Sequence, residues 1–304
     1  MSEFVKRTVF GALFVGVLVA SILLSHIMLG AVLIVMSVLG VREMMVMEKA
    51  EKRDIVRACI GAGLMFAAAF CTAYKDSKTG FIAAYGLIVT YVTYIFACSI
   101  AELKRVEIDP IRHIGLLLVS QLWIALPFAV MFMTSLTSKT LLLMLFITVW
   151  VNDTGAYCVG MLTSKLPGGN HKMSPRLSPK KSWEGLAGGI LFSIAAGCVF
   201  VAVGWGDEFG INATEITSYI IAGVFTTLTA FAAVIGDLAE SAVKRNAGVK
   251  DSGRFLPGHG GVLDRFDSML FVALVVLAAV IIFTFVFVAA AFSMHPYHPL
   301  ELLE

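Results

Sequence analysis

The sequence predicts an all-α, polytopic integral membrane protein, and three observations support this fold class. Hydrophobic residues make up 59% of the 304 residues and charged residues only 14%, with a mean hydropathy of +0.89, whereas soluble domains carry about 25% charged residues. Apolar runs of about 20 residues, long enough to cross a bilayer as helices, recur along the whole chain. The alternating segments of about ten residues that mark a transmembrane barrel do not occur.

Nine apolar runs predict nine membrane-spanning helices. The first two runs are short and are separated only at Ser25 and His26, so hydropathy alone would allow one tilted helix. Lys6 and Arg7 precede the pair and five Lys and Arg follow it between positions 42 and 57. Both flanks therefore belong on the same side, which requires two crossings. The nine runs are 9–25, 27–40, 55–74, 81–100, 114–134, 140–162, 185–204, 216–238 and 269–292.

The charges of the connecting segments predict a cytoplasmic N-terminus and an outer C-terminus. With alternating sides, 20 of the 23 Lys and Arg lie inside and only Lys75, Lys78 and Lys139 lie outside. The net charge of only +2 indicates that the basic residues do not form a general surface for binding nucleic acid. We expect one membrane domain over 1–304. Residues 1–140 carry few specific signals, and 141–292 holds the candidate site, with cytoplasmic connections at about 163–184 and 239–268.

Acidic residues gather where these helices reach the predicted cytoplasmic face. Asp153 follows an apolar run near the end of the sixth helix, and Asp264 and Asp267 open the ninth helix three residues apart. If the eighth helix continues past its apolar run, four polar residues share one of its faces, because they are spaced i, i+3, i+4 and i+7. These four are Asp237, Glu240, Ser241 and Lys244. Carboxylates at membrane depth are costly and tend to be paired or functional.

The segment 241–268, SAVKRNAGVKDSGRFLPGHGGVLDRFDS, combines five Lys or Arg, three Asp and five Gly. Magnesium prefers oxygen ligands, often one or two carboxylates together with substrate phosphates. Basic side chains bind phosphate, and glycines let backbone N–H groups approach an anion. The combination predicts metal-assisted phosphoryl transfer at a membrane surface. Purely structural roles stay open as well. The basic residues would then only fix the topology, the acidic residues of the eighth helix would form ion pairs within it, and DRFD would cap the ninth helix.

The order S-x-V-K-R-x4-K-D-x-G-x2-L-P-x-H-G-G-V-x-D-R-F-D, from Ser241 to Asp267, resembles the signature of the phosphatidate cytidylyltransferases, or CDP-diacylglycerol synthases. Three further segments are similar to motifs of that family: SPKKSWEG at 178–185, NDTGAY at 152–157 and GDLAES at 236–241. The segment LPGGNHKMSPRL between two of them is less uniform. The first five helices match mainly in hydropathy.

The resemblance implies that the phosphate of phosphatidic acid attacks the α-phosphorus of CTP, and that CDP-diacylglycerol forms while pyrophosphate leaves. It also implies Mg²⁺, paired with K⁺ in this family, and a homodimer. The implied partners are CTP, phosphatidic acid and membrane lipid, so the reaction takes place at the membrane. The resemblance implies the bacterial cytoplasmic (inner) membrane, with the site on its cytoplasmic face.

The resemblance assigns roles residue by residue. Asp237, Asp264 and Asp267 are the implied metal ligands, and Lys244 and Lys250 are catalytic phosphate contacts beside them. Asp153 is implied in binding either metal or ribose. The remaining implied substrate contacts are Lys180, Lys181, Ser182, Glu184, Ser241, Arg245, His259, Gly260, Gly261 and Arg265. Within this set, Glu184 is expected to orient a lysine, and the glycine turn to approach the triphosphate.

Two other functions stay open on the sequence. A cytidylyltransferase or kinase for another lipid, such as a polyprenol or an ether lipid, would keep the metal site and change the lipid groove. An ion-coupled transporter would also use membrane carboxylates, although these gather at one membrane face and no inverted repeat is evident. The motif of the CDP-alcohol phosphotransferases, D-G-x2-A-R-x8-G-x3-D-x3-D, does not occur in the chain.

Overall fold

The computed structural model describes residues 3–74, 77–105, 109–255 and 260–294, and it confirms the all-α membrane fold. In these residues eight helices are long and apolar enough to cross a membrane, and Thr8–Leu24 adds a shorter apolar helix. The helices are α1 (Glu3–Leu24), α2 (His26–Met47), α3 (Lys52–Cys71), α4 (Lys78–Leu103), α5 (Pro110–Ser120), α6 (Leu126–Thr137), α7 (Lys139–Thr163), α8 (Trp183–Ala202), α9 (Ile216–Asn246) and α10 (Leu263–Met294).

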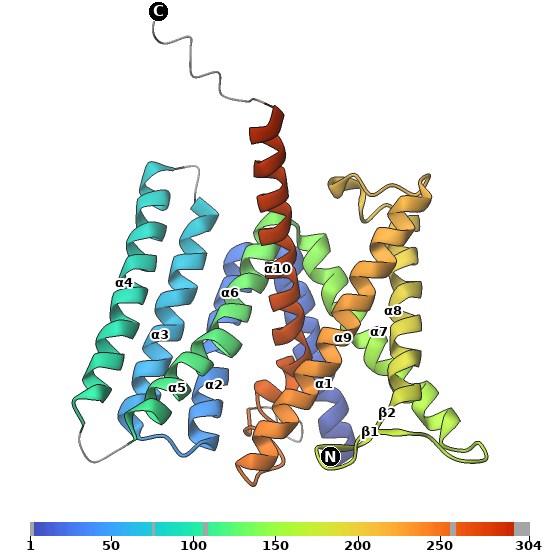
Figure 1. Cartoon of the computed structure of the whole chain (residues 1–304), viewed down its shortest axis with the longest axis horizontal. Coiled ribbons are helices and arrows are strands. Elements are labelled where there is room, and N and C mark those ends of the chain that lie inside the picture. Colours follow the sequence, from blue (N-terminus) through green and yellow to red (C-terminus); the bar gives the residue numbers. More distant parts are fainter. Residues whose placement is uncertain (1–2, 75–76, 106–108, 256–259, 295–304) are drawn as a thin grey trace, which may run out of the picture.

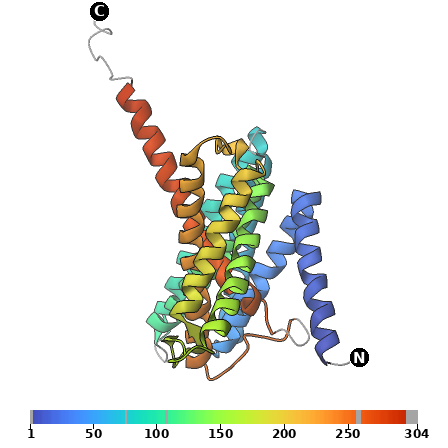
Figure 2. The same cartoon turned by 90° about the vertical axis from the view of Figure 1, so that its right-hand side faces the viewer.

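The first two apolar runs form two helices, as the flanking charges predict. The chain breaks at Ser25, whose extended backbone ends α1 and whose Oγ accepts a hydrogen bond from the Ile27 N–H at 3.2 Å as the N-cap of α2. Figure 2 shows α1 at the outside of the bundle, with α2 tilting from it towards the centre.

Successive spans run in alternating directions, so both long connections lie at one end of the bundle (Figure 1). Helix α1 begins at that end, and α10 runs to the opposite end. The alternation agrees with the predicted topology, and the assignment of this end to the cytoplasm stays a prediction. The connection between α7 and α8 contains a feature that the sequence did not predict, an antiparallel hairpin of β1 (Lys172–Ser174) and β2 (Ser178–Ser182).

The predicted fifth span is one segment, Pro110–Thr137, that changes its winding in the middle. Residues Gln121–Ala125 form a π-helical turn, η2, between α5 and α6. Pro127 has no N–H to donate to the carbonyl of Trp123, four residues earlier, so the regular ladder cannot continue here. The buried Gln121 side chain donates to the Ala58 carbonyl of α3 at 3.0 Å, which links the two spans.

Glycines allow α7 and α8 to pack closely. A Cβ added at Gly155 would overlap Phe192, one at Gly188 would overlap Val159, and one at Gly189 would overlap Asn152. Small residues let membrane helices approach in this way. Close packing matters there because the hydrophobic effect does not drive helices together in lipid. The contact brings the segment NDTGAY on α7 against the start of α8.

Phe266 anchors the start of α10 in the core. Its side chain is 1% exposed and meets the rings of Phe14, Phe128 and Phe146 at centroid distances of 5.8, 4.9 and 6.3 Å. Such edge-to-face pairs favour a defined ring orientation. The aromatic residue of DRFD therefore fixes the helix turn that carries Asp264 and Asp267.

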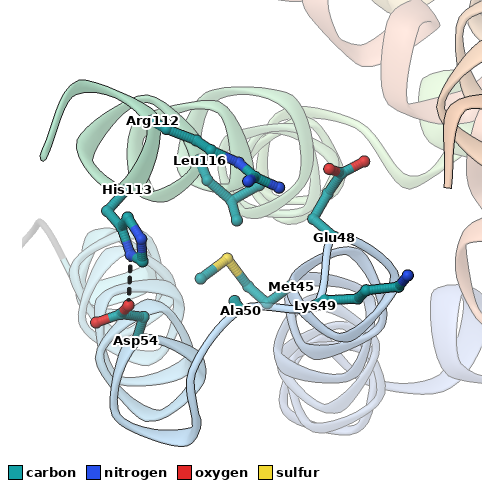
Figure 3. A pocket seen from close by; sticks show the side chains of 8 residues that line it. All are labelled: Met45, Glu48, Lys49, Ala50, Asp54, Arg112, His113 and Leu116. Atoms are coloured by element: carbon teal, nitrogen blue, oxygen red, sulfur yellow. Dashed lines mark hydrogen bonds and ion pairs between the residues drawn. The ribbon is translucent and has the colours of Figure 1, made fainter. Parts of the chain in front are cut away.

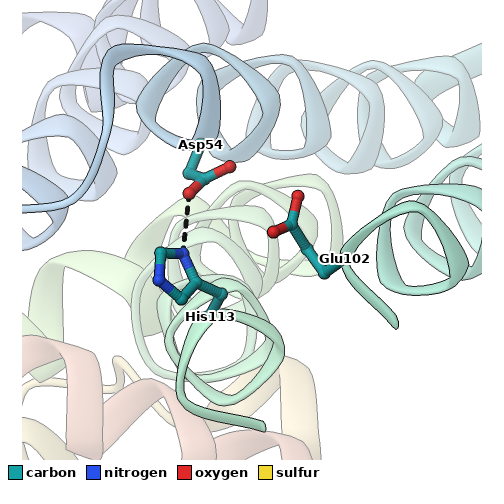
Figure 4. A group of neighbouring side chains, drawn as sticks. All are labelled: Asp54, Glu102 and His113. Carbon is teal, nitrogen blue, oxygen red and sulfur yellow. Dashed lines mark hydrogen bonds and ion pairs between the residues drawn. The ribbon is translucent and has the colours of Figure 1, made fainter. Parts of the chain in front are cut away.

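A second polar cluster lies away from the motifs, where α3, α4 and α5 meet (Figure 4). Asp54, Glu102 and His113 place one ligand atom each within 4.8 Å of one another, and His113 Nδ1 lies 2.8 Å from Asp54 Oδ2. Three guanidinium groups already surround the carboxylates, so a bound cation would meet positive charge. These are Arg53, Arg57 and Arg105. We interpret this cluster as a structural connection between the three helices.

A cavity of about 200 Å³ adjoins this cluster, between α5 and the turn that joins α2 to α3 (Figure 3). Two acidic side chains, Glu48 and Asp54, and two basic ones, Lys49 and Arg112, line it, so their charges cancel. On the exposed flank of the cluster, Arg105 pairs with Glu51 at 2.8 Å and lowers the pKa of that carboxyl.

We expect Glu102→Gln to lower the free energy of unfolding by about 1–3 kcal/mol, because the arginines lose the buried negative charge and one of the two acceptor oxygens with which they pair. Glu102 is 3% exposed and accepts from arginines of both α3 and the α4 end. Thermal unfolding in detergent, followed by tryptophan fluorescence, measures the loss. The control Glu51→Gln removes a carboxylate that is 48% exposed and costs less than about 1 kcal/mol. Equal losses would contradict the structural role of Glu102.

Candidate active site

Four helix ends lie at the end of the bundle that holds both long connections (Figure 1). They are the end of α7, the start of α8 after the β-hairpin, the end of α9 and the start of α10. Each carries one of the motifs singled out in the sequence. The candidate site is therefore built from segments that are more than 100 residues apart in the chain.

The end of α9 presents its polar residues on one face, as their spacing predicts. Ser241 Oγ lies 3.3 Å from Asp237 Oδ1, one helical turn away. Lys244 Nζ lies 2.5 Å from Glu240 Oε2 and 2.6 Å from Asp264 Oδ1 on α10. Lys244 thus connects two buried carboxylates from neighbouring helices. Pairing with a cation and hydrogen bonding offset the cost of burying these charges.

Asp264 lies in the first turn of α10 and has donors on both oxygens. Oδ2 accepts hydrogen bonds from the Ser252 N–H at 2.8 Å, the Gly261 N–H at 2.8 Å and the Ser252 hydroxyl at 2.9 Å. Oδ1 is the partner of Lys244. Gly260, with φ of 82°, wraps around this carboxylate so closely that a Cβ would overlap it.

Asp153, Asp237 and Asp267 come from α7, α9 and α10, and Asp153 lines one cleft with Asp267 and another with Asp237. Asp267 Oδ1 accepts only the N–H of its neighbour Ser268 in the described part of the chain, at 2.7 Å. Repulsion between such carboxylates is relieved when a cation binds among them. In the described residues, Asp237 is paired with Lys181 just as Asp264 is paired with Lys244, and these aspartates do not bring three ligand atoms within 4.8 Å of one another. Metal binding by Asp237, Asp264 and Asp267 therefore stays a prediction.

The β-hairpin carries Lys181 across to α9. Its Nζ lies 2.7 Å from Asp237 Oδ2 and 3.3 Å from the Val234 carbonyl. Lys180, one residue earlier on β2, is exposed. Lys181 is thus held beside the carboxylates, while Lys180 is free to move towards an anion in solution.

Ser182 and Glu184 have local roles at the start of α8. Ser182 is buried and is the N-cap, because its Oγ accepts from the Gly185 N–H at 3.1 Å. Glu184 contacts His171 rather than the lysine that we expected. Its Oε1 lies 2.6 Å from His171 Nδ1, and both oxygens lie 3.0 Å from the His171 N–H. The pair ties the start of the hairpin to the helix.

Two clefts meet at Asp153. One, of about 270 Å³, has an apolar wall from α1, including Phe14, Val15 and Leu18, and a polar wall that includes Asp264, Arg265 and Asp267. The other, of about 240 Å³, is lined by the motif residues of α7, the β-hairpin, α8 and α9, among them Asn152, Tyr157, Lys180, Lys181 and Asp237. Asp153 lines both clefts, so the two clefts are neighbours.

The model of the cytidylyltransferase family matches residues 5–283, which covers all four helix ends and both clefts. The chain belongs to the cytidylyltransferase family.

Several curated relatives are named phosphatidate cytidylyltransferase. The protein of Haemophilus influenzae is 43% identical over 129 residues, which are 42% of this chain and 41% of that relative. The protein of Staphylococcus aureus strain COL is 41% identical over 155 residues, which are 51% of this chain and 54% of that relative. The chain spans about half the length of the curated relatives that it matches.

The other predicted substrate contacts differ in where they lie relative to the two clefts. Arg245 and Lys250 are exposed at the end of α9 and in the loop that follows, and their phosphate binding stays a prediction. Gly261 directs its N–H to Asp264 rather than towards solvent. His259 falls within 256–259, outside the described residues. Arg265 lines the cleft beside α1.

Sequence reasoning missed two residues of this site. Glu43, near the end of α2, contacts the start of α10, and Ser252 contacts both Glu43 and Asp264. Glu43 follows Arg42 inside an apolar helix, and a membrane carboxylate is a signal that could have found it. Ser252 lies inside the recognised motif, but a serine in a loop carries no signal of its contacts.

Gly236 sets the distance between α9 and α10, and we expect Gly236→Ala to destabilise the protein by about 1–3 kcal/mol. An added Cβ would overlap the backbone carbonyl of Asp267, which cannot move without shifting the helix. The control Gly223→Ala lies on the same helix, where the nearest atom to a Cβ is Ile194 Cγ2 at 3.8 Å. Thermal unfolding compares the two variants. An unchanged midpoint for Gly236→Ala would contradict this close packing.

Proposed function

We propose that this protein transfers the cytidylyl group of CTP to phosphatidic acid at the cytoplasmic face of the membrane. The observation that carries the proposal is the meeting of an apolar-walled cleft and a polar cleft at Asp153. The first suits a phospholipid, with acyl groups against α1 and the phosphate near Arg265. The second suits a nucleoside triphosphate, with lysines for its phosphates. The names of the relatives, phosphatidate cytidylyltransferase, support this choice of substrates.

In this reaction a phosphate oxygen of phosphatidic acid forms a bond to the α-phosphorus of CTP, and the bond from that phosphorus to the β-phosphate oxygen breaks. Pyrophosphate leaves with the electron pair. The attacking phosphate is already an anion, so no strong base is needed. The main difficulty is to bring two polyanions together, and positioning and positive charge reduce it.

The protein's own residues perform this positioning. Lys180 and Lys181 line the polar cleft, and we assign them to the phosphates of CTP. Lys244 holds Asp264 and Glu240 in place between α9 and α10. We assign Asp153, Asp237 and Asp267 as ligands for Mg²⁺, which would neutralise charge on the phosphates when bound. The excess of Lys and Arg at this end of the bundle supports the cytoplasmic assignment.

Purified protein in detergent tests the reaction through pyrophosphate release from CTP. We expect release that requires both phosphatidic acid and Mg²⁺ and that EDTA abolishes. Two further reactions test the alternatives. Polyprenyl phosphate in place of phosphatidic acid tests another lipid substrate, and ATP in place of CTP tests a kinase; we expect little turnover in either. No release with phosphatidic acid, or equal release without any lipid, would overturn the proposal.

Asp267→Asn tests the assigned metal site. We expect the rate of CTP turnover to fall about a hundredfold, which is typical when a charge-stabilising group is removed from an active site. The Mg²⁺ concentration for half-maximal rate should also rise, because the remaining carboxylates attract the cation less. Glu215→Gln is the control, since it removes a carboxylate at the opposite end of α9 and should leave the rate within about twofold. A variant Asp267→Asn with wild-type Mg²⁺ dependence would contradict the assignment.

A further inference from the structure

Glu43 is a buried carboxylate in a part of the chain that carries none of the recognised motifs. It lies near the end of α2 and is 7% exposed. Burial of a carboxylate costs several kcal/mol unless donors surround it. Its partners therefore indicate what the residue does.

All three partners belong to the loop before α10 or to the start of that helix. Glu43 Oε1 accepts from the Val262 N–H at 3.0 Å, and Oε2 accepts from the Leu263 N–H at 3.0 Å. The Ser252 hydroxyl lies 3.0 Å from Oε2. The first N–H groups of a helix have no partner within the helix, and the positive end of its dipole favours a negative charge there. Glu43 thus caps α10 from another helix.

Ser252 extends this contact to the carboxylate of Asp264. Its Oγ lies 3.0 Å from Glu43 Oε2 and 2.9 Å from Asp264 Oδ2, and it accepts from the Asp264 N–H at 3.3 Å. A hydroxyl has one hydrogen, so it donates to one carboxylate at a time. The chain of contacts continues from Asp264 to Lys244 at 2.6 Å. The position of Asp264 therefore depends on a residue 221 positions earlier.

Glycines leave the space that this carboxylate occupies. The three atoms nearest to a Cβ added at Gly253 all belong to Glu43, and a Cβ added at Gly261 would overlap both Glu43 and Ser252. The loop therefore closes around the Glu43 carboxylate on both sides. This packing makes Gly253 a probe of Glu43 that leaves the carboxylate itself unchanged.

We propose that Glu43 is a positioning residue that fixes the first turn of α10 and, through Ser252, the orientation of Asp264 beside the cleft. The proposal rests on the proposed function for its effect on turnover, but its structural part does not. Glu43 does not line either of the two clefts as described. It acts on the reaction through α10, whose next turn carries Asp267.

Glu43→Gln is the first test. It keeps the size of the side chain but places an amide N–H against a backbone N–H, so one of the two helix amides loses its acceptor. We expect the rate constant kcat to fall about a hundredfold, because a small misplacement of a reacting group has an effect of that order. The KM for CTP should stay within about threefold, since the polar cleft is intact. The half-maximal Mg²⁺ concentration should rise, which a purely structural role would not produce.

Hydrogen exchange gives a readout without turnover. Amides in residues 260–268 should exchange at least about tenfold faster in Glu43→Gln than in the wild type, without metal or nucleotide present. The matched control is Glu48→Gln at the end of the same helix, in the separate charge-balanced cavity, which should change neither exchange nor rate. If wild-type protein releases no pyrophosphate, the proposed function fails while exchange still decides the role of Glu43. Unchanged exchange in Glu43→Gln would overturn the role.

A double variant tests the contact directly. Gly253→Ala alone should slow turnover and speed exchange of 260–268, because its Cβ displaces the Glu43 carboxylate. In a Glu43→Ala background the same substitution should have almost no further effect, since the overlapping atoms are gone. This pair also replaces Glu43→Gln if that variant does not fold. Additive effects of the two substitutions would overturn the proposal.

Discussion

The start of α10 is the point on which the site depends, because a helix that begins inside the protein must have its first N–H groups satisfied. Glu43 on α2 and Ser252 in the preceding loop accept these hydrogen bonds. Ser252 also donates to Asp264, together with the Gly261 N–H, and Lys244 on α9 pairs with its other oxygen. Buried carboxylates and helix N–H groups without acceptors are both costly, and this arrangement offsets both costs together. Phe266, one turn into the helix, fixes the rotation of α10 by packing in the core.

The two polar clusters of the molecule differ in their charge balance. In the cluster of α3, α4 and α5, three arginines face three carboxylates, so the charges cancel and the cluster serves to join helices. At the motif-bearing end, Asp237, Glu240 and Asp264 are paired with Lys181 or Lys244. Asp153 and Asp267 line the clefts and make no ion pair with another described residue. Unpaired carboxylates at a cleft are costly unless a cation or a reaction makes use of them, which separates a candidate active site from a structural network.

The location of the site follows from its two proposed substrates. A phospholipid keeps its acyl chains in the membrane and its phosphate at the surface, whereas a nucleotide arrives from water. The apolar wall of one cleft comes from α1, and the polar wall of the other comes from the β-hairpin and the helix ends around it. Close packing of α7 on α8 through Gly155, Gly188 and Gly189 places these elements side by side. Asp153 lies between the clefts because it belongs to the helix that borders both.

Hydropathy and loop charge determined the all-α membrane fold, the separate α1 and α2, and the end of the bundle at which the motifs meet. Helical spacing also predicted the shared face of Asp237, Ser241 and Lys244, because periodicity depends only on neighbouring residues. Tertiary structure alone decided that Glu43 caps α10, that Glu184 contacts His171, and that both oxygens of Asp264 are engaged. These contacts join residues that no local pattern relates. They depend on how closely whole helices pack, which small residues and buried rings decide together.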